Sequence, residues 1–368
     1  MTQLITANFS HRPGRTIASI FGVALGVVLV VLTVGLVRGL LRDRGERDTH
    51  LGFELILSLR GQQGISLTSL PLTMPLQLAD EVKTISGVEA VVPVGQQLEM
   101  KGESGLGIRQ IDGVEFASLA TASTVRIVTG QPLPPSGDLM IVDVRYATGH
   151  KTRPGDKISA LGREFTIVGI YEPETGARMM IPLTTMQEIQ SAPEKCSMLY
   201  VKCEDAAQQQ LIAARIAERL PNLRIIFTKD LPELFAYGYQ GFNVFLNLVI
   251  LLAAFISALV ILLTMYTSVT ERTRQIGILK AMGASKKFIA LVFVNEALLV
   301  GMAGVLSGLG IALLARFGIV QWMGVKLALG WDAIGYAALA GLLSGLLGAL
   351  YPALRAAQQD PIAALSYE

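Results

Sequence analysis

Hydrophobic residues along this 368-residue chain gather in four long stretches that contain no charged side chain. These stretches hold 22, 37, 19 and 22 residues, and they are bounded by Arg15 and Arg38, Glu233 and Glu271, Glu296 and Arg316, and Asp332 and Arg355. About 20 helical residues are enough to cross the hydrocarbon core of a bilayer, which is ~30 Å thick. Because lipid offers backbone amides no hydrogen-bond partner, each stretch is predicted to be a transmembrane helix.

The segment between the first two predicted spans has strand-like and helix-like patterns instead. Two βαβ-like units lie at its two ends, and their predicted elements are Phe53–Leu59, Pro75–Ile85 and Val88–Met100, then Ser197–Cys203, Asp205–Leu220 and Leu223–Thr228. Proline and glycine punctuate the region between the units, at about 125–185, which predicts a small inserted β-rich lobe. The two ends of the segment are therefore expected to form one compact α+β domain.

Charge predicts how the chain crosses the membrane. Only 16% of the residues are charged, against roughly 25% in an average soluble protein. Arg12 and Arg15 precede the first span, and the 271–287 connection has one acidic residue and five basic ones, Arg272, Arg274, Lys280, Lys286 and Lys287. Positive loops stay in the cytoplasm, so both termini and this connection are predicted to lie there. A second basic cluster, Arg38, Arg42, Arg44 and Arg47, disagrees with this topology, but a long domain is translocated largely regardless of charge.

The predicted fold is an α-helical membrane protein with four transmembrane helices plus an α+β extracytoplasmic domain. The first stretch is interpreted as a retained anchor, because it is longer than the usual 7–15 residues of a signal core. The predicted layout is 1–42 for the cytoplasmic N-terminus and first span, 43–236 for the extracytoplasmic domain, 237–270 for the second span, 271–287 for a cytoplasmic connection, 288–315 for the third span, 316–332 for a short outer loop, 333–354 for the fourth span and 355–368 for a cytoplasmic tail.

Small residues recur at four-residue spacing in three of the predicted spans. They are Gly22 and Gly26, Gly304 and Gly308, and Gly341, Ser344, Gly345 and Gly348. Helices in lipid associate closely where side chains are small. Ordinary helix packing is the simpler interpretation of this pattern, and a sliding or gating surface is the alternative.

The residues needed for catalysis are scarce. The three histidines, His11, His50 and His150, have no metal-ligand spacing, and no phosphate-binding loop of the G-x-x-x-x-G-K-[ST] type occurs. An intramembrane enzyme therefore has little support, and no catalytic, cofactor-binding or metal-binding residue is predicted. Any ATP-driven work is expected to come from a partner.

Two further features of the spans have alternative interpretations. Glu296 is an intramembrane acid, which favours a structural partner near the cytoplasmic interface over a proton relay. An aromatic cluster lies where the second span is expected to leave the outer leaflet. Its members Phe235, Tyr237, Tyr239 and Phe242 fit either interfacial anchoring or an outer-leaflet substrate contact.

The segment SVTERTRQIGILKAMGASKKFIAL, residues 268–291, is the most informative stretch. It is basic and amphipathic, with Ile276, Leu279 and Ile289 able to face the membrane or the bundle. On that interpretation Arg272, Arg274, Lys280 and Lys286 would face water. Gly277 and Gly283 permit a sharp turn before the third span. A surface helix that only fixes topology is the simplest alternative.

This segment resembles that of the FtsX-like, MacB-type ABC transporter permeases. The resemblance rests on the pattern ER-x-x-E-I-G-[IL]-L-[KR]-A-x-G-A-[ST], matched by Glu271, Arg272, Ile276, Gly277, Ile278, Leu279, Lys280, Ala281, Gly283, Ala284 and Ser285, with Gln275 in place of the acid. A following F-x-x-E-A is matched by Phe293, Glu296 and Ala297. A C-terminal signature is matched by Pro352, Ala353, Arg355, Ala356, Ala357, Asp360, Pro361, Ile362, Ala364, Leu365 and Glu368.

The resemblance implies a non-catalytic permease subunit in the bacterial cytoplasmic (inner) membrane. It implies a separate ABC ATPase that holds ATP and Mg, a second permease copy, and mechanotransmission by the spans to the extracytoplasmic domain. The expected ATPase-coupling residues are Glu271, Arg272, Arg274, Gly277, Lys280, Gly283, Lys286 and Lys287. Export or extraction of a hydrophobic or amphiphilic substrate is the expected function, with membrane lipid and a periplasmic adaptor as further partners and no nucleic acid. A transmembrane regulator or sensor acting on a cell-wall hydrolase is the alternative.

Overall fold

The computed structural model describes residues 13–61, 70–101, 107–323 and 327–360. Two compact units make up the chain. The helical unit comprises Met1–Leu40 and Gln240–Glu368, and the sheet unit comprises Leu41–Tyr239.

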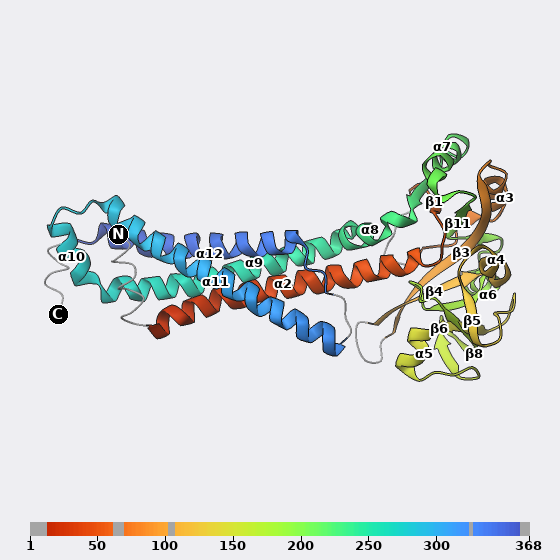
Figure 1. Cartoon of the computed structure of the whole chain (residues 1–368), viewed down its shortest axis with the longest axis horizontal. Coiled ribbons are helices and arrows are strands. Elements are labelled where there is room, and N and C mark those ends of the chain that lie inside the picture. Colours follow the sequence, from red (N-terminus) through yellow and green to blue (C-terminus); the bar gives the residue numbers. More distant parts are fainter. Residues whose placement is uncertain (1–12, 62–69, 102–106, 324–326, 361–368) are drawn as a thin grey trace. The chain divides into compact units, whose positions relative to one another are not determined.

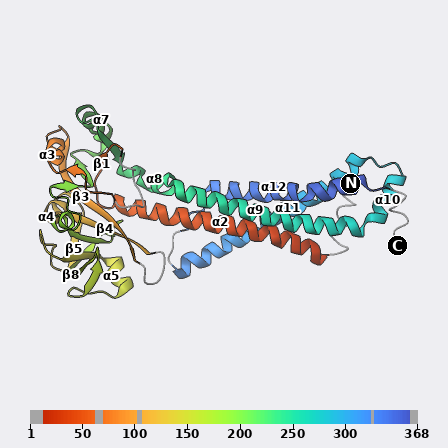
Figure 2. The ribbon, with the colours of Figure 1, turned by 180° about the vertical axis from the view of Figure 1, so that it is seen from behind.

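The helical unit contains four long helices. They are α2 (Pro13–Thr49, whose last turns belong to the sheet unit), α9 (Gln240–Glu271), α11 (Lys286–Met323) and α12 (Trp331–Gln358), and a short α10 (Thr273–Ala281) joins α9 to α11. Each long helix is long and apolar enough to cross a membrane, which confirms the four predicted spans. Helix α12 packs against both α9 and α11, as Figures 1 and 2 show. Helices α2, α11 and α12 extend beyond their uncharged stretches at both ends, because a helix does not end where its side chains become polar, whereas α9 begins six residues inside its stretch.

Glycine allows the backbones of these helices to approach closely. An added Cβ would lie 2.4 Å from Ser257 Oγ at Gly26 and 2.5 Å from the Ala258 carbonyl oxygen at Gly348. At Gly308 it would lie 2.8 Å from the Ala24 carbonyl oxygen. These contacts join α2 to α9, α12 to α9 and α11 to α2. The spacing of small residues therefore marks helix-packing interfaces, as the simpler interpretation predicted, and a gating role stays a prediction.

The sheet unit is built on two interleaved βαβ units. Their elements are β1 (Leu55–Leu59), α3 (Gln77–Lys83) and β3 (Val88–Lys101), then β11 (Met198–Cys203), α7 (Gln209–Arg219) and β12 (Leu223–Phe227). The strands pair antiparallel in the order β12-β1-β11-β3, so each unit places one strand between the two strands of the other. Leu55, Leu57, Leu199 and Val201 lie in one apolar core with Ile212 and Ile216 of α7. The predicted single domain made from two sequence ends is confirmed.

The inserted region continues the same sheet. Beyond β3 the strands follow in the order β4 (Gly107–Val114), β9 (Met179–Pro182), β6 (Leu139–Asp143), β8 (Arg163–Glu172) and β5 (Arg126–Gly130), with β7 (Lys157–Ala160) also paired to β8. Strands β5 to β9 all fall within the predicted lobe of about 125–185. They have a separate core around Phe165 and Ile167. The lobe is therefore β-rich as predicted, but its strands extend the main sheet.

Short elements complete the sheet unit. Their bounds are β2 (Met74–Pro75), α4 (Phe116–Ala122), α5 (Val144–His150), α6 (Leu183–Ile189), β10 (Lys195–Cys196), η1 (Ala206–Gln208), η2 (Thr228–Asp230) and α8 (Leu231–Gly238).

A buried carboxyl group lies on β4 of the sheet unit. Asp112 is 4% exposed, and the amide Nε2 of Gln110 donates a hydrogen bond of 2.9 Å to its Oδ1. Removal of the carboxylate from water disfavours the charged form, and burial raises the pKa of Asp112 to about 7. Between about pH 4 and pH 7, Asp112 therefore keeps its proton in the folded sheet unit, whereas the same carboxyl group is ionised in the unfolded chain.

Gly348→Ala is expected to destabilise the packing of α12 on α9. The added methyl group would meet a backbone oxygen at 2.5 Å, and that oxygen cannot move without moving α9. Overpacking of this kind typically costs about 1–3 kcal/mol. The measurement is the thermal unfolding midpoint of the detergent-purified chain. Gly310→Ala is the matched control, because nothing lies within 4 Å of an added Cβ there. Equal midpoints for the two variants would contradict the close-approach explanation.

Asp112→Asn is expected to flatten the pH dependence of unfolding. In the native chain the folded-state pKa is raised, so the stability that Asp112 contributes is fully present below pH 4 and is lost as the pH rises to about 7. The loss is at most about 4 kcal/mol, since one pKa unit corresponds to about 1.4 kcal/mol. Asparagine keeps the acceptor for Gln110 and cannot ionise. Unfolding midpoints measured from pH 4.5 to 8 should fall more steeply for the native chain than for the variant, and parallel curves would refute the assignment.

Candidate functional site

The connection between α9 and α11 is shaped by residues of the recognised pattern. Gly283 has φ +95°, a backbone conformation that favours glycine, and it follows the last turn of α10. The amide of Ala284 donates to the carbonyl of Leu279, and the amide of Gly283 donates to that of Lys280, both at 3.0 Å. Ser285 Oγ then accepts from the amide of Phe288 at the start of α11. Glycine ends one helix and serine begins the next, which fixes the turn.

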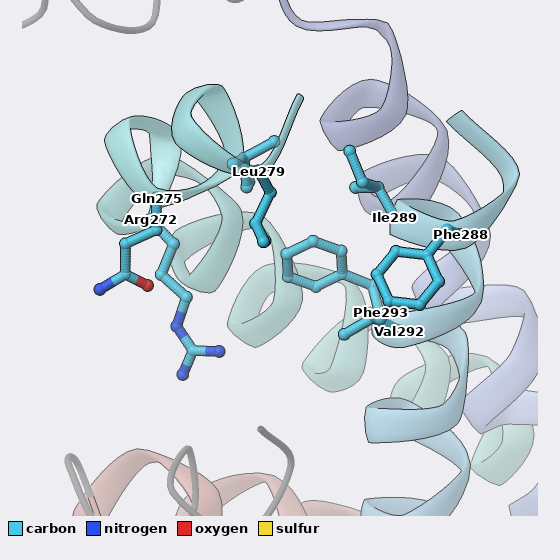
Figure 3. Close-up of a pocket in the computed structure, with 8 residues that line it drawn as sticks. Arg272, Gln275, Leu279, Phe288, Ile289, Val292 and Phe293 are labelled. Carbon is cyan, nitrogen blue, oxygen red and sulfur yellow. The ribbon is translucent and has the colours of Figure 1, made fainter. Parts of the chain in front are cut away.

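An apolar cluster holds this connection against the helices. Val269, Ile276, Ile289 and Phe293 pack with Ala353 and Ala356 of α12. A small cavity of about 70 Å³ lies between α10 and α11, and Figure 3 shows Leu279 pointing toward the ring of Phe293 beside it. All four helical segments α9 to α12 therefore meet in one core beneath the connection.

Arg272 and Glu296 form an ion pair inside this core. Their closest atoms, Nη1 and Oε2, lie 3.5 Å apart, and the side chains are 17% and 10% exposed. Arg272 lies between α9 and α10, whereas Glu296 lies on α11. A buried charge without a partner is costly, so each side chain stabilises the other in place. The structural partner predicted for Glu296 is therefore Arg272.

Lys280 ties α10 to the end of α12. Its Nζ donates to the carbonyl oxygen of Ala357 at 3.0 Å and also to that of Gln359. The last carbonyl groups of a helix have no partner within the helix and carry partial negative charge, so an ammonium group is favoured there. Nearby, Arg355 of α12 donates to the hydroxyl of Tyr266 of α9 at 2.7 Å and covers its ring. The two recognised signatures thus contact each other.

These contacts correct one expectation. Arg272 and Lys280 are only partly exposed, because both contact other helices, whereas Arg274 and Lys286 are exposed as predicted. Glu271 and Lys287 are also exposed, and Gly277 is buried in α10. The remaining C-terminal signature residues, Pro361, Ile362, Ala364, Leu365 and Glu368, lie outside the described part of the chain.

Exposed apolar side chains accompany the basic ones on the connection. Ile278 is 44% exposed and Met282 is 71% exposed. Arg274, Ile278 and Met282 are spaced four residues apart, so they follow one face of α10. The docking face is defined here as Arg274, Ile278, Met282, Lys286 and Lys287. Its charged residues belong to the expected coupling residues, whereas Ile278 and Met282 do not, although their i, i+4 spacing is visible in the sequence.

The aromatic cluster is divided by its burial. Phe235 is 3% exposed, with the Arg44 guanidinium 5.0 Å from its ring centroid and the ring of Tyr239 at 5.6 Å. The Phe235 ring therefore contacts protein in this structure. Tyr237 is half exposed, and Phe242 is half buried at the start of α9. A substrate contact at this cluster stays a prediction.

The four arginines of the second basic cluster each contact a side chain of their own unit. Arg38 pairs with Asp332 in the helical unit. In the sheet unit the partners are Asp43 for Arg47, Glu46 for Arg42 and the side-chain oxygen of Gln110 for Arg44. The positive-inside rule counts charges near the ends of the spans and does not consider such contacts. Across the described residues, no group of three or more His, Cys, Asp or Glu side chains could hold a metal ion.

The four apolar helices and the mixed sheet define a multi-pass membrane protein with a large domain between its first two spans. Two family models match the chain. FtsX-like permease C-terminal matches residues 247–361, and MacB-like periplasmic core domain matches residues 16–219. The chain belongs to the FtsX-like, MacB-type family of ABC transporter permeases.

Individual relatives agree with this assignment. The chain is 26% identical to the macrolide export ATP-binding/permease protein MacB of Rhodospirillum rubrum over 96% of its own length and 58% of the relative's. It is 27% identical to the uncharacterized ABC transporter permease YknZ of Bacillus subtilis over 59% of its length and 58% of the relative's. The chain thus spans less than two thirds of these relatives.

Solved structures of two related domains also match. The extracellular domain of YknZ from Gram-positive bacteria has a TM-score of 0.35 at 15% identity, covering 47% of this chain and 98% of that one. The periplasmic region of MacB from Actinobacillus actinomycetemcomitans has a TM-score of 0.37 at 11% identity, covering 51% and 95%.

Lys280→Met is expected to destabilise the helical unit. Methionine keeps the aliphatic stem but leaves two carbonyl groups at the end of α12 without their cationic donor. Hydrogen bonds from a charged group contribute about 1.5–3 kcal/mol, so the unfolding midpoint should fall by several degrees. Lys286→Met is the matched control, because Lys286 is exposed. The same midpoint for both variants would show that Lys280 is not a structural cap.

Proposed function

We propose that this chain is the non-catalytic permease subunit of an ABC transporter and that a separate ATPase docks on the docking face. The single observation that supports this most is the exposure of Ile278 and Met282 beside Arg274, Lys286 and Lys287. Apolar side chains surrounded by charges are typical of a protein interface. The ATPase would hold the ATP and Mg.

The internal contacts of the connection suit it to mechanical coupling. Arg272 holds α11 through Glu296, and Lys280 holds the end of α12. A displacement of α10 by the ATPase would therefore move α9, α11 and α12 together. Along the chain, α9 follows directly on α8 of the sheet unit. We infer that ATP hydrolysis in the partner moves the sheet unit by this route.

The remaining parts of the proposal concern topology and assembly. Both termini and α10 lie in the cytoplasm, and the sheet unit lies outside, in agreement with the basic residues of the connection. The apolar side chains of α9 include exposed Leu251 and Phe255, at 66% and 62%, which suits contact with lipid or with a second copy of the permease. The proposed substrate is hydrophobic or amphiphilic, and it is exported or extracted from the membrane. A periplasmic adaptor would be a further partner.

Met282→Asp is expected to weaken docking of the ATPase strongly. The change places an unpaired charge at the exposed residue that directly follows α10, where the partner surface would have to desolvate it. Loss of a central interface residue commonly costs 2 kcal/mol or more, which corresponds to about a thirtyfold loss of affinity. The measurement is co-purification of the permease with its partner ATPase, together with the ATP hydrolysis rate of the complex.

Leu211→Asp is the control for this experiment, since Leu211 is 50% exposed on α7 of the sheet unit. Retention of the ATPase and of full turnover by Met282→Asp would refute the docking face. Reconstitution of the intact complex then separates export from regulation. Movement of a lipid, peptide or small molecule supports the exporter, whereas activation of a bound hydrolase without transport contradicts it.

A further inference from the structure

The sheet unit contains a cavity of about 460 Å³ that the permease function does not use. Four arginines line it. Arg44 and Arg47 come from the last turns of α2, Arg109 from β4, and Arg178 from the residues just before β9. Ligand pockets typically have volumes of about 300–1,000 Å³, so the cavity is large enough for a small organic molecule.

The wall of this cavity has basic and neutral residues but no acidic one among those the structure describes. Asp43 pairs with Arg47 and Glu99 pairs with Arg109, and neither carboxylate is part of the wall. Among the described residues, neither Arg44 nor Arg178 forms an ion pair. Arg44 is attracted to the carboxylate of Asp48, which accepts a hydrogen bond of 3.0 Å from the amide of Gly176, and Arg178 is attracted to Asp143. None of these carboxylates belongs to a residue that lines the cavity, so a molecule in it would meet a wall of net positive charge.

Several donors of these arginines have no partner. The Nε atoms of Arg44, Arg47 and Arg109 are buried, and none has a hydrogen-bond partner among residues 13–61, 70–101, 107–323 and 327–360. The whole Arg47 residue is only 9% exposed. Buried donors without an acceptor are costly, so the protein alone satisfies these guanidinium groups incompletely. Guanidinium groups match carboxylate and phosphate oxygens in geometry as well as in charge.

The rest of the wall suits the organic part of a ligand. The rings of Tyr146 and His150 are stacked at 4.1 Å, and both residues line the cavity together with Leu98 and Met179. An aromatic and aliphatic surface beside charged groups favours a molecule with an apolar body and an anionic head.

We propose that this cavity binds a small organic anion whose phosphate or carboxylate group is held by Arg44 and Arg178. This site lies entirely in the sheet unit and does not depend on docking of an ATPase. The anion comes either from solution or from the head group of an anionic lipid, and the two sources have the same chemistry. Arg47 and Arg109 contribute positive charge but remain paired with their own carboxylates.

The test uses the full chain in phosphatidylcholine nanodiscs, titrated calorimetrically with citrate and with glycerol 3-phosphate. The unmodified chain should bind at least one of these probes saturably. Arg178→Gln should weaken that binding about tenfold or more, because it removes a charge-assisted contact. Arg178→Lys keeps the charge and should retain part of the affinity. Arg224→Gln removes the same charge from an exposed position outside the cavity and should bind as the unmodified chain does.

The source of the anion is distinguished by a second nanodisc composition. If the ligand is a lipid head group, nanodiscs with phosphatidylglycerol should block the soluble probes, and native mass spectrometry should find phosphatidylglycerol retained by the unmodified chain and lost from Arg178→Gln. If the ligand is soluble, phosphatidylglycerol should leave probe binding unchanged. The proposal is overturned if neither probe binds and no phosphatidylglycerol is retained, or if Arg224→Gln weakens binding as much as Arg178→Gln does.

Discussion

The contact between the ammonium group of Lys280 and the carbonyl groups at the end of α12 holds together the part of this permease on which the proposed coupling depends. A helix end leaves carbonyl groups without partners, and here a residue from a different helix satisfies them. The ion pair between Arg272 and Glu296 joins α11 to the same connection. The positive charges of Lys280 and Arg272 are therefore bound by groups within the protein. In this way the nine-residue helix α10 is fixed to three long helices.

This arrangement separates two roles within one short pattern. Some residues hold the connection in shape: Gly283 reverses the chain, Ser285 begins α11, and Arg272 and Lys280 bind other helices. Others remain exposed and are free to meet a partner. A segment that only anchored topology would need its charges in water, but it would not need an exposed Met282 or a capped neighbouring helix.

Sequence patterns predicted the helices and strands of this protein well, but they did not predict which distant residues contact each other. Uncharged stretches identified four helices because lipid requires about 20 apolar residues, and strand–helix–strand patterns identified the two βαβ units because they are local. The partners of Lys280 lie 77 and 79 residues away, so no local period could reveal them. The burial of Phe235 depends on Arg44, which is supplied by a helix at the other end of the domain sequence.

The second basic cluster shows how much depends on such distant partners. Judged by loop charge alone, Arg38, Arg42, Arg44 and Arg47 only weaken the predicted topology. In the structure Arg38 pairs with Asp332 of the helical unit, whereas Arg44 and Arg47 line a cavity of the sheet unit. A helix unbroken from Pro13 to Thr49 therefore supplies charged side chains to both units. Because Arg38, Arg44 and Arg47 contact specific groups, they cannot be counted with the charges of a solvated loop, and they do not contradict the proposed topology.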